Sequence, residues 1–182
     1  IGVPLGPDME YQGGFFNLLN PYAILVGLFN VAMFTNHGAI YLYLKKEGDL
    51  QEKVRGWIFH TLGIFVTLYI VVTIFTLARV PTMLGNFEHA PWMWAIALLN
   101  VLAIANIPRA LFLGLPFRAF LSSCVAIAAL IALFGAGVFP NLIRSTTDPL
   151  LNLTIYNAAS SQKTLGIMLV IACIGMPFVI TY

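Results

Sequence analysis

Long apolar segments alternate with short polar segments along most of this chain. Five segments are long enough, or nearly long enough, to cross a bilayer as helices. A helix of about 20 residues, rising about 1.5 Å per residue, matches the roughly 30 Å hydrocarbon core of a membrane. The pattern therefore predicts an all-α, polytopic transmembrane helix bundle. Its five spanning helices are expected at residues 21–44, 57–78, 92–107, 119–138 and 164–182, after an outer-face loop segment at 1–20.

Local sequence signals set several of the expected helix ends. Asn20 followed by Pro21 is typical of a helix start, because asparagine caps free N–H groups and proline fits the first turn. The third span is expected to end before Pro108, since proline lacks an N–H group. Ser160 and Ser161 are candidate N-caps of the last span. The connecting stretches expected outside the membrane are residues 45–56, 80–91, 108–118 and 141–163.

Charged residues are scarce, at 9% of the 182 residues, whereas 60% are hydrophobic. A soluble domain carries about 25% charged residues, so the composition excludes a water-soluble globular protein. The net charge of +2 is too small to indicate a nucleic-acid partner. All seven acidic residues fall outside the five predicted spans. Proton pumps usually place a carboxylate inside the membrane, so this distribution argues against an autonomous pump.

The basic residues predict how the helices are oriented. Six of the nine lysines and arginines follow the first and third spans, and three lie in the other loops. Loops rich in lysine and arginine usually stay in the cytoplasm. The N-terminal segment is therefore expected outside the cell and the C-terminal end in the cytoplasm. The six residues on the predicted cytoplasmic side are Lys45, Lys46, Lys53, Arg55, Arg109 and Arg118.

Polar residues in the first span are the main candidates for chemistry. Asn30, His37 and Tyr41 are spaced seven and four residues apart and share one helix face, and Asn36 adjoins them. One interpretation is a haem ligand or proton relay at His37. The favoured interpretation is a neutral histidine that hydrogen-bonds to a neighbouring helix, with Gly38 permitting close approach.

A metal or haem site made by this chain alone has weak support. The three histidines, His37, His60 and His89, lack the close spacing of common metal motifs. An autonomous haem enzyme would need His37 and His60 to face each other at matching depth. Cys124 and Cys173 fall inside predicted spans and fit helix packing better than a disulfide or zinc site. We therefore name no catalytic, cofactor-binding or metal-binding residue.

Three groups of motifs point to a known family. The first group is Gly2-Val3-Pro4-Leu5 and Phe15-Phe16-Asn17-Leu18-Leu19-Asn20-Pro21-Tyr22-Ala23. The second is His37-Gly38-Ala39-Ile40-Tyr41-Leu42 and Glu47-Gly48-Asp49-Leu50. The third is Phe139-Pro140, Leu153-Thr154-Ile155-Tyr156-Asn157-Ala158-Ala159-Ser160-Ser161, Thr164-Leu165 and Met168-Leu169. Together they resemble subunit II of cytochrome bd-type quinol oxidases, along nearly the whole chain.

This resemblance implies a nine-helix subunit built from two four-helix bundles and one more helix. The chain is then expected to be a fragment, the second half of such a subunit, with helices five to nine. The resemblance implies a heterodimer with subunit I, which carries haem b and haem d, oxidises quinol and reduces dioxygen to water. No cofactor is expected on this chain. A structural quinone, a small accessory subunit and the lipid bilayer are the other expected partners, in a bacterial or archaeal plasma membrane.

Few functional residues follow from the resemblance. Asn157, Ser160 and Ser161 match the motif that leads into the ninth helix, where capping and loop closure are the implied roles. The match around His37 implies a packing site rather than a haem ligand. The alternative function is half of a membrane transporter, or a channel subunit. A transporter should show paired broken helices or a buried charge, and the sequence contains one spanning helix interrupted by proline, at Pro177.

Overall fold

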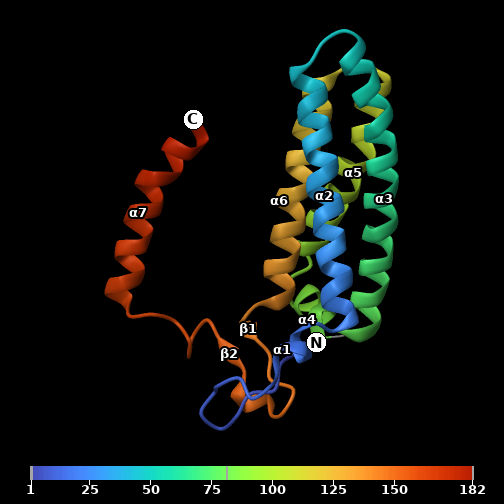
Figure 1. The fold of residues 1–182 in the computed structure, drawn as a ribbon. Helices are drawn as coiled ribbons and strands as arrows, with labels where there is room; N and C mark the ends of the chain where they lie inside the picture. Colours follow the sequence, from blue (N-terminus) through green and yellow to red (C-terminus); the bar gives the residue numbers. More distant parts are fainter. Residues whose placement is uncertain (1, 81, 182) are drawn as a thin grey trace.

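Four of the five long helices form a bundle, and the fifth stands apart from it (Figure 1). The computed structural model describes residues 2–80 and 82–181. Among these residues, five helices are long and apolar enough to cross a membrane, which confirms the predicted fold class. The bundle consists of α2 (Pro21–Lys45), α3 (Asp49–Arg79), α5 (Met93–Phe112) and α6 (Pro116–Val138), and the separate helix is α7 (Gln162–Thr181).

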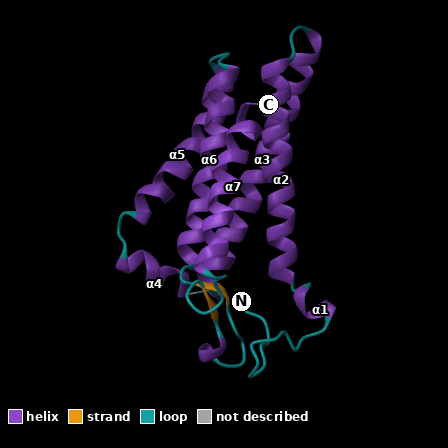
Figure 2. Cartoon of the chain, turned by 90° about the vertical axis from the view of Figure 1, so that its left-hand side faces the viewer, coloured by secondary structure: helices purple, strands orange, loops and turns teal. Residues whose placement is uncertain are grey.

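Shorter elements gather at the end of the bundle where the N-terminus lies (Figures 1 and 2). They are α1 (Phe15–Leu18), α4 (Thr82–His89), β1 (Asn141–Ile143), the 3-10 helix η1 (Pro149–Leu151) and β2 (Leu153–Thr154).

The N-terminal segment is held at this end by backbone hydrogen bonds. Strands β1 and β2 pair antiparallel, with Asn141 opposite Thr154. Val3 donates its N–H to the carbonyl of Arg144 at 2.9 Å and accepts from the N–H of Thr146 at 3.0 Å. An isolated parallel bridge between Val3 and Ser145 thus ties the first residues to the stretch after β1, far away in sequence. We call residues 2–12 and 141–157 together the cap.

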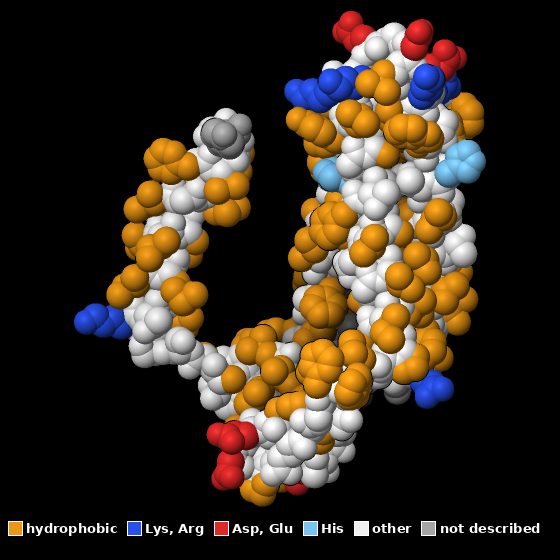
Figure 3. Space-filling view, viewed as in Figure 1, with side chains coloured by type: hydrophobic (Ala, Val, Ile, Leu, Met, Phe, Trp, Pro, Cys, Tyr) orange, Lys and Arg blue, Asp and Glu red, His pale blue; other side chains and the backbone are white. Residues whose placement is uncertain are grey.

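The surface of the helices is what a lipid environment requires. Figure 3 shows apolar side chains along the bundle and along α7, with charged side chains near the helix ends and on the cap. Helix α7 has no buried residue. Apolar groups facing lipid carry no hydration cost, so exposed leucine and isoleucine side chains are ordinary here. The separation of charged from apolar surface agrees with five membrane-spanning helices.

The deepest side chains lie in one cluster inside the four-helix bundle. Ile40 of α2, Val54 and Ile58 of α3, and Ile107 and Leu111 of α5 are each at most 1% exposed. Lipid is as apolar as this interior, so close packing rather than water exclusion holds the cluster together. Every methyl group removed here leaves unfilled space and loses contacts.

Small residues line the contact between α5 and α6. Ala103 and Ala110 of α5 are buried, as are Ala119 and Ala126 of α6, and each pair is spaced seven residues apart. Two helices with alanine at this spacing can bring their backbones close together. The α5–α6 pair is joined by the short turn of residues 113–115, in which Gly114 adopts a φ of +66°. That left-handed conformation is easy for glycine and strained for other residues.

Two predicted helix starts are confirmed by side-chain caps. Asn20 accepts a hydrogen bond from the N–H of Ala23 at 2.9 Å, in front of α2. Ser161 accepts one from the N–H of Thr164 at 3.3 Å, in front of α7. Ser160 is exposed one position earlier. Both caps use chemistry within three residues along the chain, which explains why the sequence alone predicted them.

The structure corrects several expected boundaries. Helix α3 begins at Asp49, so most of the expected link 45–56 is helical. Its first turn carries Asp49 and Glu52, whose negative charge favours a helix N-terminus. Helix α5 continues through Pro108 to Phe112 instead of ending before the proline. Helix α6 begins at Pro116, a first-turn proline, three residues before the predicted start.

Two stretches expected to be loops contain secondary structure. The stretch 80–91 contains helix α4, and the stretch 141–163 contains β1, η1 and β2. Each of these four elements has at most eight residues, too few to appear as a long apolar segment in the hydropathy pattern. Their contacts are with segments elsewhere in the chain: α4 packs against α6, and β1 pairs with β2.

Asn86 of α4 closes the cap end of α6. Its amide nitrogen donates to the carbonyls of Ala136 at 2.9 Å and Phe139 at 2.5 Å, with a longer contact to Gly137 at 3.4 Å. The last carbonyls of a helix lack donors within the helix. The Asn86 side chain of α4 therefore supplies the hydrogen-bond donor that these carbonyls at the end of α6 would otherwise lack.

Asn86→Leu is expected to lower the free energy of unfolding by about 1–3 kcal/mol, because it leaves these carbonyls without their donor. Thermal unfolding in detergent, followed by tryptophan fluorescence, would measure the change. Glu88→Leu is the matched control, since Glu88 is an exposed residue of the same helix. Equal melting temperatures for Asn86→Leu and Glu88→Leu would contradict the capping role.

Candidate functional site

Polar side chains form a hydrogen-bonded belt across the interior of the bundle. The Nδ1 atom of His37 on α2 lies 2.8 Å from the hydroxyl of Ser123 on α6. That hydroxyl donates to the carbonyl of Phe120 at 2.7 Å. A serine has a single hydroxyl proton, so Ser123 accepts from His37, whose ring carries its proton on Nδ1. The predicted bond from His37 to a neighbouring helix is therefore present.

Two further bonds extend the belt to the other helices. Asn36 of α2 is buried, and its side-chain oxygen lies 3.1 Å from the hydroxyl of Thr61 on α3. The same hydroxyl lies 3.1 Å from the carbonyl of Ile58, so its single proton is shared between the two acceptors. Asn106 of α5 donates its amide to the hydroxyl of Ser122 on α6 at 2.8 Å. Such bonds between membrane helices contribute about 0.6 kcal/mol each on average. We call the six residues the polar belt: Asn36, His37, Thr61, Asn106, Ser122 and Ser123.

Aromatic rings cover the edge of the belt between α2 and α6. The rings of His37 and Phe120 stack with their centroids 5.2 Å apart. Tyr41 lies 5.7 Å from the same Phe120 ring, and the Lys45 ammonium lies 5.8 Å from the ring centroid of Tyr41. Asn30, expected on this face, is exposed and donates its amide to the carbonyl of Val26 in its own helix. It does not join the belt.

The remaining candidates are not brought to the belt. His60 is exposed, and its Nδ1 atom lies 2.9 Å from the carbonyl of Gly56 in its own helix. A methyl group added at Gly38 would meet nothing within 4 Å among the described residues, so close approach there is not supported. Across residues 2–80 and 82–181, no three His, Cys, Asp or Glu side chains group as metal ligands would. Cys124 is half-buried and Cys173 is exposed, and both are free thiols.

Asn100 is the most deeply buried polar residue and lies on α5, apart from the belt. Its side chain is 0% exposed, and its amide donates to the carbonyl of Ala126 at 2.8 Å. Its Oδ1 atom is buried and has no hydrogen-bond partner among the described residues. An unpartnered buried carbonyl is costly, so this side chain is held by packing rather than by a full set of hydrogen bonds.

Asn157 closes the loop that leads into α7. Its side-chain oxygen accepts from the N–H of Thr154 at 2.6 Å and from the Thr154 hydroxyl at 3.0 Å. Its amide donates to the carbonyl of Asn152 at 2.9 Å. Together with the cap at Ser161, these bonds fix the path between β2 and α7. In the structure, Asn157 and Ser161 therefore make hydrogen bonds that hold the loop and the start of α7.

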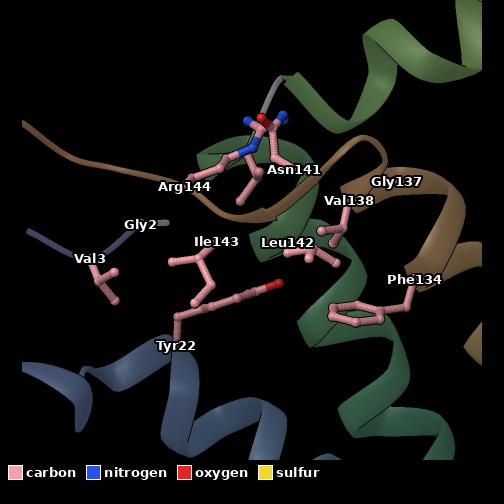
Figure 4. Close-up of a pocket in the computed structure, with 11 residues that line it drawn as sticks. Gly2, Val3, Tyr22, Phe134, Gly137, Val138, Asn141, Leu142, Ile143 and Arg144 are labelled. Atoms are coloured by element: carbon pink, nitrogen blue, oxygen red, sulfur yellow. The ribbon is translucent and has the colours of Figure 1, made fainter. Parts of the chain in front are cut away.

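A pocket of about 240 Å³ lies between the cap and the bundle (Figure 4). Its walls come from the N-terminal segment, the first turn of α2, the end of α3, the last turns of α6, and β1 with the residue after it. Sequence reasoning missed this pocket. Its lining residues come from distant segments, and no local motif joins them.

The comparisons with known proteins agree with this architecture. The family model described as "Cytochrome bd terminal oxidase subunit II" matches residues 1–182. The chain belongs to this family. The resemblance found in the sequence is confirmed, and membership favours an oxidase subunit over a transporter or channel.

Three similar proteins show how much of a family member is present. "Cytochrome bd-I ubiquinol oxidase subunit 2" of Escherichia coli (strain K12) is 28% identical over 223 residues, covering 100% of this chain and 56% of the relative. "Probable cytochrome oxidase subunit 2" of Haemophilus influenzae is 28% identical, covering 96% and 53%. "Cytochrome bd ubiquinol oxidase subunit 2" of Bacillus subtilis is 23% identical, covering 98% and 52%. The chain spans about half the length of these relatives.

Proposed function

We propose that this chain is part of the non-haem membrane subunit II of a cytochrome bd-type terminal oxidase. In this role it supports a haem-bearing subunit I, which oxidises quinol and reduces dioxygen to water in the aerobic respiratory chain. The observation that carries the proposal is the family match along the whole chain. Two of the similar proteins, those of Escherichia coli and Bacillus subtilis, are named as subunits of ubiquinol oxidases.

The positions of the acidic residues favour a structural role for this chain over a catalytic one. Asp49 and Glu52 are helical, but they lie in the first turn of α3. That helix has 31 residues, more than the roughly 20 that cross the hydrocarbon core, so its first turn fits outside the core. The other acidic residues are Asp8, Glu10, Glu47, Glu88 and Asp148, which lie in the cap, in links or in α4.

The proposed complex assigns the cofactors to the partner. Haem b and haem d belong to subunit I in this proposal, and the polar belt holds the bundle of subunit II together. A structural quinone and a small accessory subunit are further proposed components. We place the complex in the plasma membrane, with the cap outside and the C-terminal end of α7 in the cytoplasm. This orientation rests on the distribution of basic residues.

Purification through a tag on this chain tests the proposal. The purified complex is expected to contain a haem-bearing partner and to show b- and d-type absorption bands. After the subunits are separated, the fraction with this chain is expected to show no haem absorption. Haem bound stoichiometrically to the separated chain would overturn the proposed role, as would the absence of any haem protein from the purified complex.

His37→Ala is expected to lower the amount of assembled complex by about two- to tenfold, because it removes the α2–α6 hydrogen bond and the ring stacked on Phe120. Turnover per assembled complex should stay close to the original value. The two measurements are the haem content per milligram of membrane protein and the rate of oxygen consumption per haem. His60→Ala is the control, since that ring is exposed and its Nδ1 atom contacts a carbonyl of its own helix. Normal assembly with lost turnover would show that His37 has a chemical role.

A further inference from the structure

The pocket between cap and bundle is polar at one end and apolar at the other. Figure 4 shows the side-chain ends of Arg144 and Asn141 together at one end of the pocket. The rings of Tyr22 and Phe134 lie at the opposite end. A ligand that fits this pocket therefore carries a polar group on one side and a hydrocarbon portion on the other.

The direction of this polarity is that of a membrane leaflet. Tyr22 stands in the first turn of α2, and Phe134 stands one turn before the end of α6 at Val138. Both belong to spanning helices, so their rings lie at the edge of the hydrocarbon layer. Arg144 and Asn141 belong to the cap, beyond the end of α6. A lipid entering from the bilayer would meet the apolar end with its chain and the polar end with its head group.

Charge identifies the class of head group. The described residues that line the pocket include Arg144 and no aspartate or glutamate. A guanidinium has five N–H donors in one plane, so it can bind two phosphate oxygens and still keep another partner. The Asn141 amide adds two donors. The N–H donors of Arg144 and Asn141, with the single positive charge of Arg144, complement a head group that carries a phosphate and no cationic group.

The size of the pocket limits how much of the ligand enters. Its volume of about 240 Å³ is below the roughly 300–1,000 Å³ of common small-molecule sites. The pocket is also partly open to its surroundings. A head group with the start of one acyl chain therefore fits better than a whole molecule, and the rest of the lipid would stay in the bilayer.

We propose that this pocket binds one anionic phospholipid from the surrounding leaflet. The phosphate contacts Arg144 and Asn141, and the start of an acyl chain lies against Tyr22 and Phe134. The backbone of Arg144 is already held by the bond from Val3, so the polar end is organised before the lipid binds. The bound lipid joins the cap to the ends of α2 and α6.

Native mass spectrometry of the protein, purified from its membrane with the subunits that accompany it, tests this proposal. Dissociation constants for added phosphatidylglycerol are compared between the unchanged protein and two variants. Arg144→Gln is expected to weaken one binding event by about tenfold or more, since it removes a charged hydrogen-bond donor. Arg79→Gln is the matched control, because Arg79 is an exposed arginine at the same end of the bundle and does not line the pocket. Equal weakening by both variants would show general surface attraction and would overturn the proposal.

A third variant and two other ligands separate the remaining explanations. Val138→Phe keeps every charge but fills part of the pocket, and is expected to weaken phosphatidylglycerol binding about as much as Arg144→Gln. Undiminished binding to Val138→Phe would place the lipid elsewhere and overturn the proposal. Phosphatidylcholine is expected to bind at least about tenfold more weakly than phosphatidylglycerol, and equal affinity would contradict an anionic site. Displacement of the lipid by millimolar inorganic phosphate alone would show a simple anion site. Unchanged subunit content in each variant confirms that the protein is assembled.

Discussion

Asn100→Asp is expected to lower the free energy of unfolding by on the order of 3–5 kcal/mol, the usual cost of an uncompensated buried charge. Asn100 is 0% exposed and donates its amide to the Ala126 carbonyl. Aspartate would replace that donor with an oxygen that faces another oxygen. Its charge would have no counter-charge nearby on α5 or α6. The basic residues of these helices, Arg109 and Arg118, lie in the last turn of α5 and the first turn of α6.

Asn100→Leu is expected to change the stability by less than about 1 kcal/mol, although it also removes the hydrogen bond. The Ala126 carbonyl keeps its partner within α6, since it lies in the helix interior. The Oδ1 atom of Asn100, which has no hydrogen-bond partner in the described part of the chain, disappears with the substitution. Leucine has the same branched side-chain skeleton as asparagine, so it fits the site with the smallest change of shape available to an apolar residue.

The two variants form one experiment. Loss of the folded fraction is measured by size-exclusion chromatography in detergent at increasing temperature. Aspartate should unfold the chain far below the temperature at which leucine does. Comparable damage from both substitutions would show that the amide itself is required, and the structural account of Asn100 would then fail.

Hydropathy and helix length predicted the spanning helices because both follow from the thickness of the bilayer. Local chemistry predicted the caps at Asn20 and Ser161 because each cap bonds within three residues. The end of α5 was predicted wrongly because it depends on packing. Ile107 and Leu111 flank Pro108 and are almost completely buried, so their contacts maintain a helix that the proline alone would end. The carbonyl of Ala110 then accepts from the N–H of Leu115 in the following turn.

The polar belt was only half predictable for the same reason. The spacing of polar residues in the first span indicated a histidine bonded to another helix. The partner, Ser123, is 86 residues away in sequence, and the adjacent serines Ser122 and Ser123 carry no pattern that identifies the helix they bond to. The pocket at the cap was not predictable at all, since its polar end and its apolar end come from different segments of the chain. Pairings between distant segments depend on how the helices pack, which one sequence does not reveal.

Val54→Asp tests the largest disagreement between pattern and structure. Residues 45–56 read as a polar link because they contain seven charged residues. In a water-facing link the substitution would change the stability by less than about 0.5 kcal/mol. In the structure Val54 belongs to α3, is 0% exposed and lies in the bundle cluster. A carboxylate there is expected to lower the free energy of unfolding by about 3 kcal/mol or more, because it loses its water without gaining a partner.

Lys53→Asp provides the matched control for this substitution. Lys53 is the preceding residue and is exposed, and a negative charge near the start of a helix is tolerated or favourable. Thermal unfolding should therefore separate the two neighbours clearly, with Lys53→Asp near the unchanged protein. Similar melting temperatures would mean that residues 49–56 are not packed as helix, and α3 would then begin near Trp57, as hydropathy predicted. A large difference would show that the polar side chains cover one face of a helix whose other face is part of the core.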